Sequence, residues 1–100
     1  MSCYDTIDLA DGNINDQVKC WGCEMKVYHE GDTVPDTFLM RSYAIALRSS
    51  GYVIIDNCVI KKWQEDKPVG MPIYDKWGEP FDDKTVGLLS ERYVGYGLEE

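Results

Sequence analysis

Two cysteines at a Cys-x-x-Cys spacing, Cys20 and Cys23, are the residues whose types and positions best suit a defined chemistry. Two thiolates at this spacing can bind one zinc ion from a single turn, and a structural zinc site takes four ligands. Cys3, His29 or Cys58 would supply the other ligands. A complete zinc ribbon carries a second Cys-x-x-Cys pair, and this sequence has none. We therefore expect no cofactor, with a zinc-stabilised structural module as the alternative.

The same pair is a weaker candidate for redox chemistry. A thioredoxin-like pair opens a helix after a β-strand, whereas Cys20 and Cys23 fall inside a β-forming segment. Small thiols are common in protein cores, which is the simplest role for the 4 cysteines of this chain. In a reducing cytosol they are expected to be thiols or metal ligands and not disulfides.

Catalytic groups do not assemble into a set. His29 is the single histidine, and a general base there would have Glu30 and Asp32 beside it. No serine has the context of a nucleophile elbow, no glycine-rich phosphate loop is present, and paired acids such as Asp82-Asp83 lack the spacing of a calcium-binding EF-hand loop. The sequence therefore predicts a protein that is not an enzyme. A magnesium-dependent hydrolase or nuclease accessory that uses loop carboxylates is a minor alternative.

The charge is acidic and unevenly distributed. The chain has 18 acidic and 10 basic residues, for a net charge of −8. Residues 1–40 and 64–100 carry −6 and −5, whereas residues 41–63 carry +3. Because such a surface repels phosphate, direct nucleic-acid binding is disfavoured. One interpretation is a solvated surface that aids solubility, and the other is a surface that attracts a basic partner or mimics nucleic acid.

Alternation of apolar and polar residues predicts β structure in the first third of the chain. Residues 4–9 form the first expected strand, and Asp11-Gly12-Asn13 is a turn signal. A longer β segment is expected over residues 17–28. Its alternation changes phase at Trp21-Gly22, which predicts a bulge or tight turn there.

The remaining elements complete a mainly β domain. Residues 42–47 alternate cleanly, and the β-forming runs on either side of Asp56-Asn57 predict a central hairpin. Prolines make residues 64–82 a loop with one brief extended piece, and residues 83–93 fit a helical face that Asp82 or Asp83 would cap. We expect one domain over residues 1–100, an antiparallel sheet or small barrel with one short C-terminal helix. An α+β arrangement is the alternative.

Tryptophans supply the best candidates for a binding surface. Trp21 lies at the phase break and Trp77 precedes a glycine in a loop, so both are expected to be exposed and to anchor a partner. Acidic residues would steer that partner electrostatically. The acidic binding candidates are Glu30, Asp32, Asp82 and Asp83.

Several short motifs resemble those of a group of small proteins encoded by tailed bacteriophages. The matching pieces lie within residues 4–60. They are Tyr4-Asp5-Thr6, Gln17-Val18-Lys19, Cys23, the Tyr-x-x-Gly-Asp turn at residues 28–32 followed by Val34-Pro35, and the later hairpin segment Gly51-Tyr52-Val53-Ile54. Where the family has a Cys-Pro-x-Cys-Gly knuckle, this chain reads Leu9-Ala10-Asp11-Gly12-Asn13, so half of any zinc site is missing. The resemblance implies a phage origin and brings no activity with it.

The expected function is therefore that of a small acidic phage-encoded protein. It would bind a host or defence protein and inhibit or redirect it, with nucleic-acid mimicry as one mode. The opening residues show no secretory signal, and no apolar run is long enough to span a membrane. These features predict a protein of the host cytoplasm without a membrane partner, and a homo-oligomer is compatible with the sequence.

Overall fold

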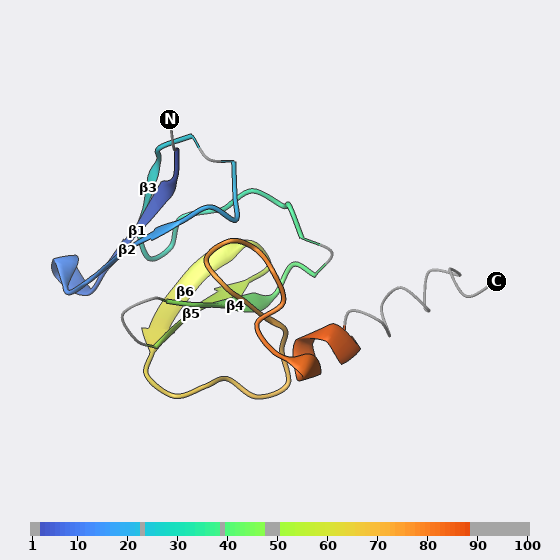
Figure 1. The fold of residues 1–100 in the computed structure, drawn as a ribbon. Helices are drawn as coiled ribbons and strands as arrows, with labels where there is room; N and C mark the ends of the chain where they lie inside the picture. Colours follow the sequence, from blue (N-terminus) through green and yellow to red (C-terminus); the bar gives the residue numbers. More distant parts are fainter. Residues whose placement is uncertain (1–2, 23, 39, 48–50, 89–100) are drawn as a thin grey trace.

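The computed structural model describes residues 3–22, 24–38, 40–47 and 51–88. Within these ranges the chain forms two β-sheets, with the strand orders β2-β1-β3 and β6-β5-β4-β7 (Figure 1). The strands are β1 (Asp5–Leu9), β2 (Ile14–Val18), β3 (Val27–Tyr28), β4 (Tyr43–Ala46), β5 (Tyr52–Asp56), β6 (Val59–Gln64) and β7 (Ile73–Tyr74). The prediction of a mainly β fold with a short helix is confirmed.

The first sheet is built on an antiparallel hairpin of β1 and β2. Alternate side chains of β1 point into the core, so Asp5, Ile7 and Leu9 are buried, while the two residues between them are only half-buried. The 3-10 turn η1 (Ala10–Gly12) joins the two strands, at the position of the predicted turn.

The β segment expected over residues 17–28 is not continuous, so that expectation was wrong. β2 ends at Val18, and β3 is a two-residue strand that pairs in parallel with β1. The physical reason lies in Cys20 and Trp21, which are adjacent and both buried, with exposed fractions of 8% and 6%. Neighbouring side chains of a strand point to opposite faces, so the chain must leave strand geometry to bury both. In place of the bulge or tight turn predicted at Trp21-Gly22, the chain bends at Cys20 and Trp21 within a stretch that belongs to neither strand.

The second sheet contains the predicted central hairpin. β5 and β6 pair antiparallel on either side of Asn57 and Cys58. The φ angles of these two residues are +54° and +65°, and positive φ at both central positions is characteristic of a type I′ turn. β4 pairs antiparallel with β5, and β7 adds to the other edge of β4 in parallel. Each sheet therefore includes one parallel pair of strands. The sequence had predicted an antiparallel sheet or small barrel, without parallel pairs.

The two sheets share one hydrophobic core in which aromatic rings meet. The ring of Tyr43 lies 4.8 Å from that of Phe38 and 5.5 Å from that of Tyr74, both edge to face. Trp21 packs on Tyr28 of the first sheet in the same geometry, at 4.9 Å. Such pairs add stability beyond the apolar area that they bury.

Trp21 was expected to be exposed, and this expectation is wrong because the side chain belongs to the core. Its indole Nε1 donates a hydrogen bond of 2.9 Å to the hydroxyl of Tyr43. Burial raises the pKa of that hydroxyl, so it remains a neutral phenol. The bond connects the segment that follows β2 to β4, and hence the first sheet to the second.

Replacing Tyr43 by phenylalanine is expected to lower the free energy of unfolding by about 2 kcal/mol. The ring contacts persist, but the buried indole N–H of Trp21 loses its acceptor, and an unpaired buried donor costs about 1–3 kcal/mol. Urea denaturation followed by circular dichroism measures the change. The double variant Trp21→Phe/Tyr43→Phe removes donor and acceptor together. Its loss of unfolding free energy should therefore be smaller than the sum of the losses of the two single variants. Strictly additive losses would contradict this role of the bond.

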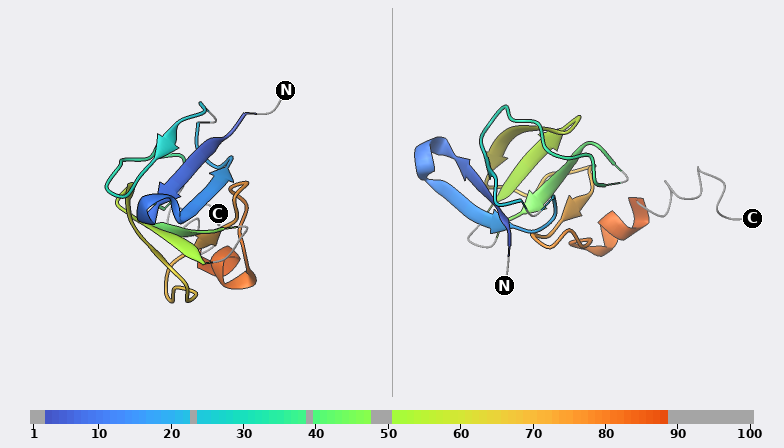
Figure 2. Two further views of the ribbon diagram at one scale, coloured as in Figure 1. Left: turned by 90° about the vertical axis from the view of Figure 1, so that its left-hand side faces the viewer. Right: turned by 90° about the horizontal axis from the view of Figure 1, so that it is seen from above.

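The helical residues lie on the opposite side of the described chain from η1, as Figure 1 and the right view of Figure 2 show. Residues 83–88 are helical, at the position where the sequence predicted a helix over 83–93. Residues 89–93 of that prediction, and the tail after them, lie outside the described ranges. Over the described chain, no helix has the length and apolar character that crossing a membrane requires.

Candidate functional site

A tight loop between β7 and the helical residues presents Trp77. The carboxylate of Asp75 organises this loop, because its Oδ1 accepts hydrogen bonds from the backbone amides of Trp77 at 2.8 Å and Glu79 at 3.0 Å. The backbone of Asp75 adds two further bonds, donating to the carbonyl of Glu79 at 2.9 Å and accepting from the amide of Gly78 at 3.0 Å. Four hydrogen bonds within five residues fix the backbone on both sides of Trp77.

The loop is also held against the rest of the domain. The amide of Lys19, directly after β2, donates to the carbonyl of Lys76 at 2.6 Å. Gly78 sits against the core, because a Cβ atom at this position would lie 3.3 Å from the Cβ of Cys20 and 3.5 Å from the ring of Phe38. Its φ of +87° also favours glycine. The loop is therefore anchored to both the first sheet and the core.

Trp77 itself points outward, with an exposed fraction of 55%. The exposure predicted for this residue is confirmed. Two ammonium groups lie over its ring, Nζ of Lys19 at 4.9 Å and Nζ of Lys76 at 5.4 Å from the ring centroid. These are cation–π distances, so the two lysines and the indole form one small cationic and aromatic surface. We call Lys19, Lys76 and Trp77 the Trp77 patch.

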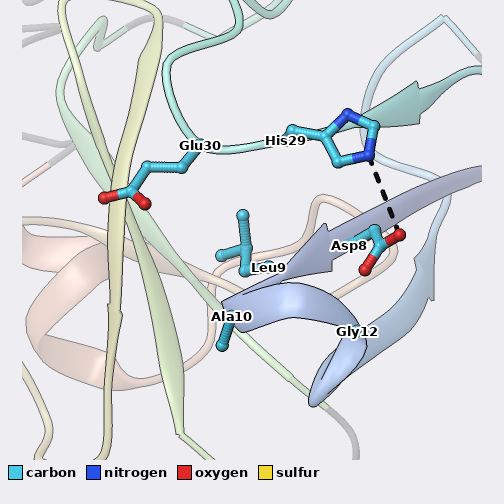
Figure 3. Close-up of a pocket in the computed structure, with 6 residues that line it drawn as sticks. All are labelled: Asp8, Leu9, Ala10, Gly12, His29 and Glu30. Carbon is cyan, nitrogen blue, oxygen red and sulfur yellow. Dashed lines mark ion pairs between the residues drawn. The ribbon is translucent and has the colours of Figure 1, made fainter.

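The second candidate site is a pocket beside the single histidine, His29. It is a pocket of about 420 Å³ lined by Asp8, Leu9, Ala10, Gly12, His29 and Glu30. Figure 3 shows the side chains of His29 and Glu30 leaving the same turn in different directions, with Asp8 facing the imidazole. Imidazole Nε2 lies 3.7 Å from the carboxylate of Asp8, and Nδ1 lies 3.7 Å from that of Asp32. The backbone amide of His29 also donates to Asp32, at 2.8 Å.

These contacts hold the imidazole between two carboxylates. They connect β1 with the turn that follows β3, and they place the predicted residues Glu30 and Asp32 in one neighbourhood with His29. The six residues that line the pocket include no hydroxyl or thiol nucleophile. The lining of the pocket therefore lacks the nucleophile that an acyl-transfer site needs.

The three cysteines that the structure describes are one disulfide-bonded residue and two free thiols. Cys3 is disulfide-bonded, which corrects the expectation that all cysteines would be thiols or metal ligands. Cys20 is a buried free thiol whose pKa rises to about 12, chiefly because burial disfavours the thiolate. Cys58 is likewise buried and free, and its sulfur accepts a hydrogen bond from Arg41. Cys23 lies outside the described residues.

No cluster suited to a metal ion occurs among the residues that the structure describes. A site would need at least three histidine, cysteine or acidic side chains gathered together, and the described ranges contain no such group. Cys3 in its disulfide and Cys20 as a protonated thiol do not fit zinc, which binds thiolates. His29 is held by Asp8 and Asp32, away from any described cysteine ligand set.

Asp82 and Asp83, the other predicted binding residues, lie at the start of the helical residues. Oδ1 of Asp82 accepts a hydrogen bond from the amide of Thr85 at 2.9 Å, and Oδ2 pairs with Nζ of Lys67 at 2.7 Å. Asp82 therefore caps the helix as the sequence predicted. The hydroxyl of Thr85, which is buried, accepts in turn from the amide of Ile73 in β7 at 2.8 Å. Asp83 is exposed.

The stabilising effect of Asp82 is expected to depend on pH. The hydrogen bond from Lys67, followed by that from Thr85, lowers the pKa of this carboxyl to about 2 from an ordinary 3.8. A lowered pKa in the folded state means that the stabilisation is complete above about pH 4 and is lost as the pH falls towards 2.

The variant Asp82→Asn tests this dependence because it removes the charge and keeps an oxygen that can cap the helix. We expect the wild type to be more stable by up to about 1 kcal/mol at pH 6, with the gap closing between pH 4 and 2. Urea denaturation across this pH range measures the gap. A difference that is constant with pH would show that the charge of Asp82 contributes nothing.

The residues that sequence reasoning missed are Lys19 and Lys76. They stand 57 positions apart, and only the contact of the Trp77 loop with the end of β2 brings them onto one ring. The sequence carries one partial signal, because Lys76 directly precedes the tryptophan. No family model, curated protein or solved structure matches the chain.

Proposed function

We propose that this chain is a binding protein that recognises another protein through the Trp77 patch. The observation that carries the proposal is a half-exposed tryptophan on a loop whose backbone is fixed by Asp75. Following the resemblance to phage proteins, the partner is a host or defence protein that the chain inhibits or redirects.

An exposed Trp77 does not contribute the stability that its burial would give the domain, and a binding role explains why it is exposed. A small domain gains much of its stability from burying aromatic side chains, and this domain buries Trp21 almost completely. Tryptophan is also the residue type most enriched among those that dominate interface energies. A loop that is already ordered loses little entropy when it binds, so its contacts translate into affinity more fully.

The His29 pocket supports this function less well than the Trp77 patch. Its histidine is engaged by two carboxylates, and its lining offers no nucleophile. We therefore propose binding and not catalysis. Recognition through nucleic-acid mimicry would instead depend on acidic side chains such as Glu30 and Asp32, and the experiment below separates the two modes.

The test is affinity capture from a bacterial lysate with the wild type and matched variants, quantified by mass spectrometry. Trp77→Ala should reduce a specifically captured protein by about tenfold or more, because truncating an interface anchor commonly costs 2 kcal/mol. Val69→Ala is the control, since it removes an apolar side chain that is 88% exposed elsewhere. Equal capture by the wild type and Trp77→Ala would refute the proposal. Loss of capture confined to Glu30→Gln/Asp32→Asn would favour mimicry.

A further inference from the structure

The two lysines of the Trp77 patch form no ion pair with the residues that the structure describes. Within the described residues, the ion pairs involve other cations, and neither Lys19 nor Lys76 has a carboxylate oxygen within 4.0 Å. Both side chains belong to half-buried residues, so their stems pack on the protein while their ammonium groups face the indole. In a chain with a net charge of −8, this leaves a local cationic site.

We propose that the partner presents an acidic protein segment to this patch. An apolar side chain of the segment packs on the indole of Trp77, and flanking carboxylates pair with Lys19 and Lys76. This inference rests on the proposed function and specifies its partner. Charge complementarity is the basis, because opposite charges beside an apolar anchor give both orientation and faster association.

The electrostatics of the whole chain favour a protein segment over a nucleic acid. A nucleic acid brings one phosphate per nucleotide along an extended strand, and most of that charge would face the acidic remainder of the molecule. A short acidic segment brings a few carboxylates, and these can be confined to the two lysines.

The outer edge of β2, next to the patch, does not offer the partner an alternative way of binding, in which it would add a strand to the sheet. The amide of Thr6 in β1 donates towards β3, so the backbone of its cross-strand partner Gln17 faces the outer edge of β2. The Gln17 amide is occupied by the side chain of Asp16 at 2.9 Å, and the next outward amide, that of Lys19, is occupied by Lys76. At this end of β2 a partner therefore contacts side chains and not unpaired backbone groups.

The experiment is an NMR titration of the full chain in which the indole N–H signal of Trp77 is identified from the variant Trp77→Phe. The probes are a short peptide of aspartate, glutamate and leucine residues, the same peptide with lysine at each acidic position, and an oligothymidylate of equal length. The acidic peptide should shift the Trp77 signal. The double variant Lys19→Gln/Lys76→Gln should raise its Kd about tenfold, the effect of losing two exposed charge pairs.

The control is Lys61→Gln/Lys62→Gln, which removes the same charge from exposed lysines of β6 and should leave the Kd within about twofold. Equal binding of the acidic and basic peptides, stronger binding of the oligothymidylate, or no shift with the acidic peptide would overturn the inference. A lysate partner that depends on Trp77, combined with any of these results, would leave the proposed function standing. A partner indifferent to Trp77 would remove both.

Discussion

The variant Asp5→Ala is expected to lower the free energy of unfolding by about 3 kcal/mol, because the side chain of Asp5 is fully buried and accepts hydrogen bonds from two backbone amides of a distant segment. Its Oδ1 accepts hydrogen bonds from the amides of Glu24 at 3.1 Å and Lys26 at 3.0 Å. Both hydrogen bonds are partly buried, and a donor left unpaired away from water costs about 1–3 kcal/mol. The carbonyl of Lys26 also accepts a hydrogen bond of 2.8 Å from the amide of Thr6. The loss of stability therefore extends to the pairing of β1 with β3.

Urea denaturation measures this change, and two variants separate its causes. Asp5→Asn keeps an oxygen acceptor and should cost less than Asp5→Ala. Asp8→Asn alters an acid on the opposite face of the same strand, where the side chain is 31% exposed, and should cost at most about 1 kcal/mol. Equal losses for Asp5→Ala and Asp8→Asn would show that the buried carboxylate does not organise residues 24–26.

Asp5 also shows where sequence reasoning stopped. From the sequence, an acidic residue in the first strand is predicted to be solvated, since aspartate is rarely buried without partners. Its partners are backbone amides about twenty positions away. Because almost every residue has a backbone amide, the sequence does not indicate which amides Asp5 will bind. The same limit explains β3, whose two residues are a strand only because Asp5 and β1 hold them.

Local patterns were informative where the structure depends on neighbours in sequence. The β5–β6 hairpin follows from alternation around Asp56-Asn57, and the start of the helix follows from the capping type of Asp82. Trp21 and Trp77 have similar sequence contexts, each beside a glycine, but opposite exposures. What separates them is distant, namely the hydroxyl of Tyr43 for Trp21 and the anchoring of the Trp77 loop by Lys19.

The variant Gly51→Ala is expected to lower the free energy of unfolding by about 3 kcal/mol, for two reasons that add. The φ of Gly51 is +79°, a conformation that costs other residues about 1–2 kcal/mol. The new Cβ would also meet the indole of Trp63, at 2.5 Å from Cε2 and Cζ2. Relieving such an overlap displaces a ring packed against the core, and overpacking of this kind costs about 1–3 kcal/mol.

Gly70 allows the two contributions to be separated. Its φ of +82° is almost the same, but a Cβ there would have no neighbour within 4 Å. Gly70→Ala should therefore show the backbone cost alone, about 1 kcal/mol once the reduced entropy of the unfolded chain is included. In a Trp63→Leu background, which removes the indole, the cost of Gly51→Ala should fall to that of Gly70→Ala. If Gly51→Ala cost no more than Gly70→Ala in the wild-type background, Trp63 would not be packed against Gly51.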